Sequence, residues 1–322
     1  MPSPSNLLAL RPVAALHHLS RGSEACPLSL RDLARALARR PAPLPVVAAP
    51  LLAIARGALV AASEADAVVG LFCAGAAAPE PWFEAVAEAA HELSARRPFF
   101  VSAVVRVEDG EASPAQGRAF AYRFVEAGIT HLAVDVTALP ISRRAQAVAL
   151  TAGFAAEREV AVDCVLPPDL ASRNDPLEAR AFIEEFEGWG VRADLVSLRV
   201  SAPVDRAAAS SQLEALAAVG REAGDRPVMR RGPLSPPLLA ALRGSGLCAC
   251  EDGGAALSAC MRALPGELRR AAAEDGRGTL AIPPALAERL EALAYGEVSS
   301  FIESAGAAGT ATAALSALMA GP

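Results

Sequence analysis

Five charged residues stand at or near the ends of short apolar runs, and their types limit the chemistry available to them. They are Asp135, Asp163, Arg199, Arg230 and Arg231. A guanidinium group presents a planar fork that binds phosphate or carboxylate through two hydrogen bonds, so the arginines predict a pocket for a small phosphorylated or carboxylate ligand. An alternative interpretation is that buried arginines and aspartates only neutralise one another. The two aspartates could hold a hard cation, but no further ligand accompanies them, and no metal site is predicted.

The adjacent pair Arg230 and Arg231 follows an apolar run that reads as a strand. Successive side chains of a strand point to opposite faces, so the two arginines cannot both point inward. We expect Arg231 to hold the anion, with Arg199 or Arg230 assisting, and one of the adjacent pair to be structural.

Other side chains that carry chemistry are scarce. The chain has no lysine, which excludes Schiff-base aldolases and the phosphate-binding P-loop. Its histidines are His17, His18, His91 and His131, and each is interpreted as a surface or structural residue. Six scattered cysteines are expected to be reduced and buried. We therefore predict no catalytic residue, no metal and no cofactor.

Composition and charge narrow the choice of partners. The chain has 322 residues, a net charge of −6, and aromatic residues make up 4% of it, which argues against nucleic acid as a partner. The longest apolar stretch, 44–62, is interrupted by Pro45, Pro50 and Arg56, so no membrane span is expected. No secretory signal is visible, and a cytoplasmic location is expected.

Repeating apolar runs determine how the charged side chains are positioned. Eight short apolar runs, most of which contain β-branched residues, occur at 44–49, 67–73, 99–105, 131–137, 160–166, 194–200, 227–231 and 246–250. Such runs alternating with amphipathic helices are typical of a parallel sheet covered on both faces. Eight units predict a (β/α)8 TIM barrel, in which the strand ends meet at one mouth. An open doubly wound sheet is the alternative, but no G-x-G-x-x-G turn follows the first run.

The two ends of the chain are expected to complete this barrel. Residues 29–40 read as a helix that closes its bottom, and extra helices are expected from Pro283 onward. No linker rich in Gly, Ser or Pro divides the chain. We interpret residues 29–322 as one barrel domain, preceded by a loosely structured N-terminal segment, 1–28.

Three stretches of the chain resemble class II aldolases, which act on fructose or tagatose bisphosphate. They are VEAGITHLAVDVTALPISRRAQAV (125–148), RPVMRRGPLSPPLLAALRGSGLCACEDGGAAL (226–257) and VSSFIESAGAAGTA (298–311). The resemblance spans roughly residues 29–311 in the expected order and implies a TIM barrel. In that family, histidines at the mouth hold a divalent metal, usually zinc, and an aspartate moves the proton.

The positions that carry this chemistry in the family are different here. Ser102, Val104 and Val105 replace the His-x-Asp-His pattern after the third strand, and Arg231 stands where the last metal ligand should be. No histidine occurs in 200–204, and the phosphate loop is replaced by GPLS (232–235). The resemblance therefore implies a degenerate member, without the metal ligands or the proton-transfer group.

These departures favour a non-catalytic aldolase-like barrel that acts as a scaffold or regulatory subunit. Two-subunit tagatose-bisphosphate aldolases are a precedent, because one subunit supports the other without doing the chemistry. The expected partner is a second copy of the chain or a related aldolase-like barrel. The alternatives are an enzyme with metal-independent chemistry and a sensor of small anions, acting on a phosphorylated sugar or a carboxylate.

Overall fold

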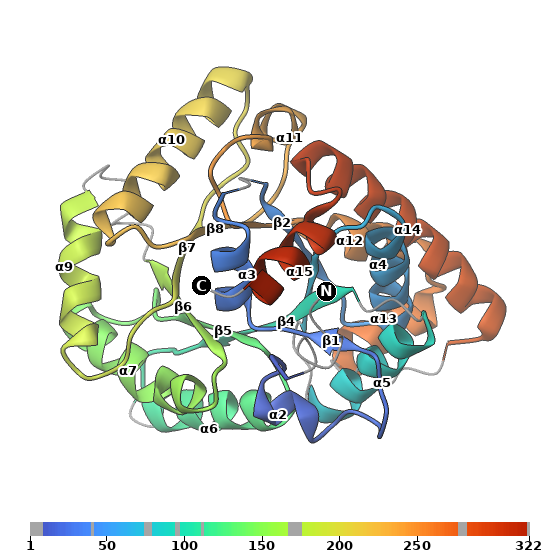
Figure 1. Cartoon of the computed structure of the whole chain (residues 1–322), viewed down its shortest axis with the longest axis horizontal. Coiled ribbons are helices and arrows are strands. Elements are labelled where there is room, and N and C mark those ends of the chain that lie inside the picture. Colours follow the sequence, from blue (N-terminus) through green and yellow to red (C-terminus); the bar gives the residue numbers. More distant parts are fainter. Residues whose placement is uncertain are drawn as a thin grey trace.

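The structure is a computed structural model of the chain and describes residues 9–39, 42–73, 79–93, 97–110, 113–166, 176–275 and 282–320. Eight parallel strands close into a barrel, because β9 pairs with β2 and each other strand pairs with its neighbours in sequence (Figure 1). The strands are β2 (Leu44–Ala48), β3 (Val69–Phe72), β4 (Pro98–Arg106), β5 (His131–Asp135), β6 (Ala161–Leu166), β7 (Leu195–Arg199), β8 (Val228–Arg231) and β9 (Ala249–Glu251). The predicted TIM barrel is confirmed, and each strand overlaps the run that predicted it, with ends that differ by at most three residues.

Helices cover the outside of the barrel and connect its strands. They are α4 (Leu52–Glu64), α5 (Pro79–Glu92), α6 (Ser113–Glu126), α7 (Ile141–Glu157), α9 (Pro176–Glu187), α10 (Arg206–Glu222), α11 (Pro236–Leu242) and α12 (Ala255–Ala263). Alanine and valine fill most of the layer between helices and strands, where small side chains let the helices approach closely. Trp82 of α5 is buried in this layer and donates its indole N–H to the carbonyl of Ala49 at 2.9 Å.

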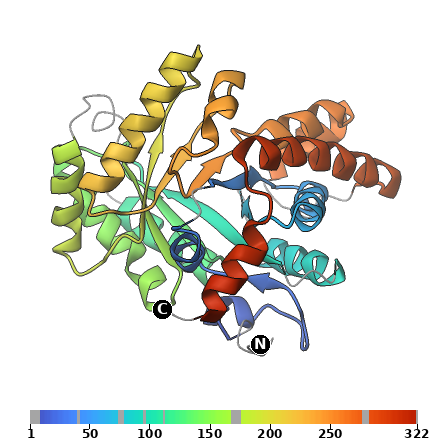
Figure 2. The same ribbon diagram turned by 45° about the horizontal axis from the view of Figure 1, so that its top comes forward.

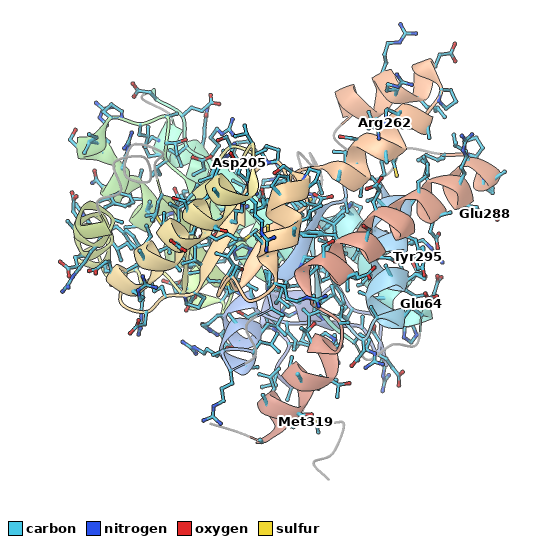
Figure 3. All side chains as sticks on the ribbon, turned by 90° about the horizontal axis from the view of Figure 1, so that it is seen from above. Glu64, Asp205, Arg262, Glu288, Tyr295 and Met319 are labelled. Atoms are coloured by element: carbon cyan, nitrogen blue, oxygen red, sulfur yellow. The ribbon has the colours of Figure 1, made fainter. Side chains whose placement is uncertain are left out.

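Two helices from opposite ends of the chain form the floor of the barrel. They are α3 (Leu30–Ala36) and α15 (Thr310–Ala320), which pack against each other in the middle of the ring (Figures 1 and 2). Their buried side chains join the lower bore residues in one apolar cluster: Leu30, Leu33, Leu44, Val68, Phe100, Leu195, Met229, Ala311 and Ala314. Figure 3 places Met319 of α15 at the opposite end of the molecule from Asp205, which caps α10. The predicted closing helix is confirmed, and α15 supplies a second one.

The segment that precedes the closing helix also contributes to the fold where it is described, from residue 9 to 28. Its β1 (Cys26–Pro27) pairs with the start of β4, and its α2 (Val13–Leu16) contacts α6. Ala14, Ala15 and Cys26 are buried. Burial raises the pKa of Cys26 to about 12, so this thiol is protonated and packs as a small apolar group.

The extra C-terminal helices include α13 (Gly266–Asp275) and the long α14 (Pro284–Ala305). Helix α14 lies along α4, and the hydroxyl of Tyr295 donates to Glu64 at 2.6 Å (Figure 3). Gly57 of α4 lies at the contact, where an added Cβ would stand 2.4 Å from the carbonyl oxygen of Glu291. The absence of a side chain at residue 57 therefore sets the distance between the two helices. Among the described residues, no helix is both long and apolar enough to cross a membrane.

Candidate functional site at the barrel mouth

A cavity of about 730 Å³ lies at the carboxyl ends of the strands. It is lined by Val46, Ala48, Phe72, Val104, Arg106, Glu108, Arg199, Gly232, Pro233, Glu251, Asp252, Gly253 and Gly254. TIM barrels bind their ligands at this end, because the loops and strand ends converge there. The cavity is therefore the candidate site.

Two arginines converge on one buried carboxylate beside this cavity. Asp135 ends β5 and is 1% exposed, while Arg199 of β7 donates to its Oδ2 at 3.3 Å. The Nε of Arg106, at the end of β4, lies 3.6 Å from the same oxygen. The other carboxylate oxygen accepts both the amide and the hydroxyl of Thr137. Arg106 and Arg199 remain 52% and 46% exposed, so their outer N–H groups face the cavity and solvent.

Arg231 lies below this pair and is held by three partners within the bore. It donates to Asp163 at 2.9 Å, to Ser197 at 2.8 Å and to Glu251. Burial alone would lower the pKa of Arg231, but Glu251 and Asp163 raise it above its usual value. The same contact with Arg231, together with His131, outweighs burial and lowers the pKa of Asp163. Both groups are therefore charged, and the interpretation as a buried ion pair describes their geometry.

The chain of contacts continues from Asp163 towards the floor. His131 Nε2 lies 3.4 Å from Asp163 Oδ2, and its Nδ1 lies 2.9 Å from the hydroxyl of Ser102. Burial lowers the pKa of His131, so the ring is neutral near pH 7, and its Nδ1 accepts from Ser102 when the proton is on Nε2. Serine, histidine and aspartate in this order resemble a nucleophile relay. All three side chains are fully buried, however, and Ser102 cannot meet a substrate in this structure.

Arg230 points away from the bore, as strand alternation requires. It donates to the carbonyl oxygens of Ser201, Gly232 and Pro233 and to the side chain of Gln212 on α10. The predicted site residues thus separate into three groups. Arg199 and Asp135 meet at the mouth, Arg231 and Asp163 pair in the bore, and Arg230 fastens the loop after β8 to the outer layer.

The loops after β8 and β9 also converge at the mouth, where TIM barrels commonly bind phosphate through backbone amides. Here the carboxylate of Asp252 accepts the amides of Gly254 and Ala256 at 2.8 and 3.2 Å. These donors at the start of α12 are therefore already used by an internal anion. Burial raises the pKa of Asp252 to about 6, although its backbone hydrogen bonds act in the opposite direction.

Arg106 and Glu251 line the cavity but were not among the predicted pocket residues. Arg106 pairs in register with Asp135 across β4 and β5, and Glu251 follows the residue that pairs with Arg230. Alternation along β4 places Ser102, Val104 and Arg106 on the same inward face, and this pattern could have identified Arg106 from the sequence. The register between neighbouring strands, which sequence alone does not give, determines which carboxylate each arginine meets.

The arrangement can bind an anion at the rim without using the buried charges. Arg106 and Arg199 supply exposed donors, and Asp135 fixes their positions from below. The charged groups of the bore lie in ion pairs with one another, while among the described residues Asp163 Oδ1 and His131 Nε2 have no hydrogen-bond partner.

Comparison with known proteins finds similar solved structures but no match to a protein family by sequence. No protein-family model matches the chain, and no curated protein matches it. The structure is similar to that of the YdjI aldolase from Escherichia coli K12, with a TM-score of 0.63 at 14% identity over 88% of this chain and 99% of the other.

Two further structures are similar at lower scores. A protein of Coccidioides immitis assigned to the fructose-1,6-bisphosphate aldolases has a TM-score of 0.55 at 15% identity, covering 87% of this chain and 96% of the other. A protein of Sinorhizobium meliloti 1021 assigned as a tagatose 6-phosphate kinase has a TM-score of 0.52 at 17% identity, covering 86% and 87%. At these identities the similarity concerns the fold alone, so the chain is a TIM barrel with aldolases among its structural neighbours.

Proposed function

We propose that the chain is an aldolase-like barrel that binds a small phosphorylated or carboxylate ligand at its mouth and acts as a regulatory or scaffold subunit. The observation that carries the proposal is the convergence of Arg106 and Arg199 on Asp135 at the edge of the cavity. Two guanidinium groups share one carboxylate, so an anion that enters the cavity meets donors that are already held in position.

The charges around the cavity support Arg106 and Arg199 as the binding pair. Glu251 is engaged by Arg231, and Asp252 by backbone amides, so neither carboxylate neutralises the two rim arginines. In this proposal Arg199 binds the anion together with Arg106. The sequence analysis expected Arg231 to bind it, with Arg199 or Arg230. Arg231 and Arg230 then act as supports of the mouth.

The binding step is tested by thermal unfolding with inorganic phosphate and with fructose 1,6-bisphosphate as probes. We expect both to raise the unfolding temperature, and Arg106→Ala or Arg199→Ala to weaken the response about 10- to 100-fold in ligand concentration, because each removes charged hydrogen bonds. Arg118→Ala, which changes an exposed arginine of α6, is the matched control and should respond like the parent chain.

A parent chain that never responds to either probe would contradict the binding proposal, as would equal responses from all three variants. The same samples are assayed for cleavage of fructose and tagatose bisphosphate. None is expected, because Ser102, Val104 and Val105 offer neither a metal ligand nor a proton-transfer group at the mouth. Cleavage that a chelator abolishes would contradict the non-catalytic part.

A scaffold acts through contact with another protein, and we propose a second copy of the chain as that partner. Support comes from large apolar side chains exposed on the neighbouring helices α6 and α7, namely Phe120, Tyr122, Ile141 and Leu150. Light scattering at micromolar concentration should show a dimer or larger oligomer, and Ile141→Asp should shift it towards monomer. A strict monomer for the parent chain would overturn this part of the proposal.

A further inference from the structure

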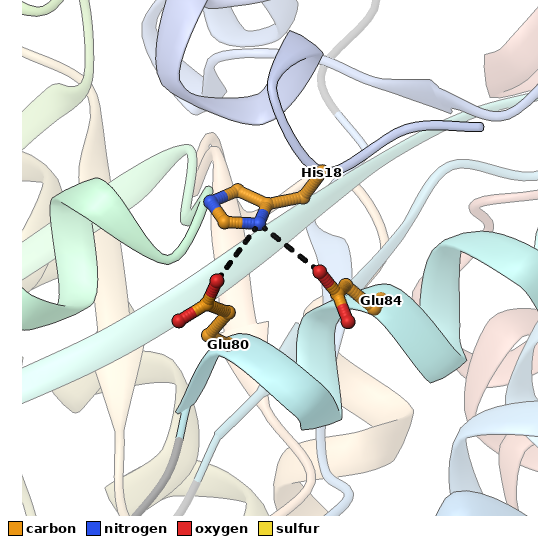
Figure 4. A group of neighbouring side chains, drawn as sticks. All are labelled: His18, Glu80 and Glu84. Carbon is orange, nitrogen blue, oxygen red and sulfur yellow. Dashed lines mark hydrogen bonds and ion pairs between the residues drawn. The ribbon is translucent and has the colours of Figure 1, made fainter. Parts of the chain in front are cut away.

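A histidine and two glutamates meet on the outer wall of the barrel, away from the mouth (Figure 4). His18 lies ahead of the barrel, and Glu80 and Glu84 belong to the first turns of α5. The ring of His18 is 11% exposed, and the two carboxylates are 61% and 53% exposed. We propose that His18, Glu80 and Glu84 bind one divalent metal ion of the zinc type, through Nδ1 and one oxygen of each carboxylate.

The spacing of the three donor atoms fits a metal ion between them. His18 Nδ1 lies 3.6 Å from Glu80 Oε1 and 3.4 Å from Glu84 Oε1, and all three atoms lie within 4.8 Å of one another. Direct N–H···O hydrogen bonds are usually 2.7–3.2 Å long. Ligands at about 2.0–2.2 Å from a tetrahedral zinc are separated by about 3.3–3.6 Å. Both distances from Nδ1 to a carboxylate oxygen fall in that range, and the shorter one also meets the geometry of a long hydrogen bond to Glu84.

The ring of His18 is held in the orientation that a metal ligand needs. Its Nε2 lies 2.6 Å from the carbonyl oxygen of Glu126, which can only accept, so Nε2 carries the proton. Nδ1 is then the ring atom that faces the two carboxylates and is the one available to a metal ion between them. Metal-binding histidines almost always donate their other N–H in this way. The edge contact with the buried Phe83, with centroids 6.0 Å apart, fixes the ring further.

The charge balance also favours a cation. Glu80 and Glu84 are four residues apart on one helix, where like charges repel. Among the described residues, neither carboxylate forms an ion pair with an arginine, and His18 is the group that each faces. The two carboxylates carry two negative charges, which a divalent ion would balance.

Three protein ligands leave one coordination position of a tetrahedral ion for water or an outside ligand. The ion would also fasten the segment ahead of the barrel to α5. The sequence analysis expected no metal and took His18 as a surface or structural residue. His18 and Glu84 are 66 residues apart in the sequence, and only the folded chain brings them together.

The test is calorimetric titration of the whole chain with zinc after removal of bound metal by a chelator. We expect one equivalent to bind, and His18→Ala to weaken binding by at least about 100-fold, because it removes a ligand rather than an outer partner. Glu80→Gln and Glu84→Gln should each weaken binding as well. The matched controls are His17→Ala and Glu88→Gln, which change an exposed neighbour on each element and should bind like the parent.

Cobalt substitution gives an independent reading, because a tetrahedral site produces a strong visible absorption that His18→Ala should abolish. Far-ultraviolet circular dichroism checks that each variant is folded. Absence of zinc binding by the parent chain would overturn the proposal and would leave the contacts of His18 with the two carboxylates as purely structural ones. Undiminished binding by the folded His18→Ala chain would overturn it equally. Neither result bears on the mouth, whose response to phosphate is measured separately.

Discussion

Replacing Arg231 with methionine is expected to lower the free energy of unfolding by about 3–5 kcal/mol, the cost of leaving a buried charge without its partner. Arg231 is 1% exposed and contacts both Asp163 and Glu251. Without it, His131, whose pKa burial lowers, is the one ion-pair partner that Asp163 keeps among the described residues. Chemical denaturation of parent and variant measures the difference directly.

Arg199→Met provides the matched control, because Arg199 is the register partner of Arg231 on the neighbouring strand. Arg199 is 46% exposed, and the buried Asp135 keeps Arg106 beside it, so this substitution should cost about 1 kcal/mol or less. The double change Arg231→Met with Asp163→Asn should be less harmful than the sum of the two single changes, since both partners of the pair are then neutral. A cost below 1 kcal/mol for Arg231→Met would show that the bore does not depend on this pair.

Gly57→Ala is the second substitution expected to be strongly destabilising, by about 1–3 kcal/mol, as in an overpacked contact. Alanine is the better helix former by about 1 kcal/mol, so intrinsic propensity favours the change. The added Cβ would, however, stand 2.4 Å from the Glu291 carbonyl oxygen and 2.9 Å from the Ala294 side chain. Backbone cannot rotate away as a side chain can, so α14 must move from α4.

Gly296→Ala on α14 separates propensity from packing. Gly296 is an exposed helical glycine whose added Cβ would meet nothing within 4 Å. This variant should gain up to about 1 kcal/mol, because alanine restricts the unfolded chain and favours the helix. Thermal or chemical unfolding of both variants gives the comparison. If Gly57→Ala were also stabilising, α4 and α14 would not be in the close contact described.

The sequence predicted the barrel because its signals are local. Most of the apolar runs are short and contain several β-branched residues, so they specified strands regardless of their neighbours, as β6 and β7 illustrate. Alternation along β8 likewise required that Arg230 and Arg231 point to opposite faces, and they do.

The partners of these side chains could not be derived in the same way. Arg231 meets Glu251 and Asp163 only because the barrel closes with a particular register between strands, and Arg106 reaches Asp135 for the same reason. His18 depends on a still longer step, since nothing local connects it with α5. A strand can be predicted from a few neighbouring residues, whereas the contacts of a site depend on how the whole barrel closes.

The two helices under the bore, α3 and α15, are synthesised at very different times. Helix α3 leaves the ribosome early, but α15 begins only at Thr310, after every strand has been made. Until then, the apolar cluster that contains Leu44, Val68 and Leu195 lacks the side chains that α15 contributes to it. A nascent or truncated chain without α15 thus exposes apolar surface at the floor of the barrel, and exposed apolar surface promotes aggregation and chaperone binding. Helix α15 therefore completes the apolar cover of the barrel floor.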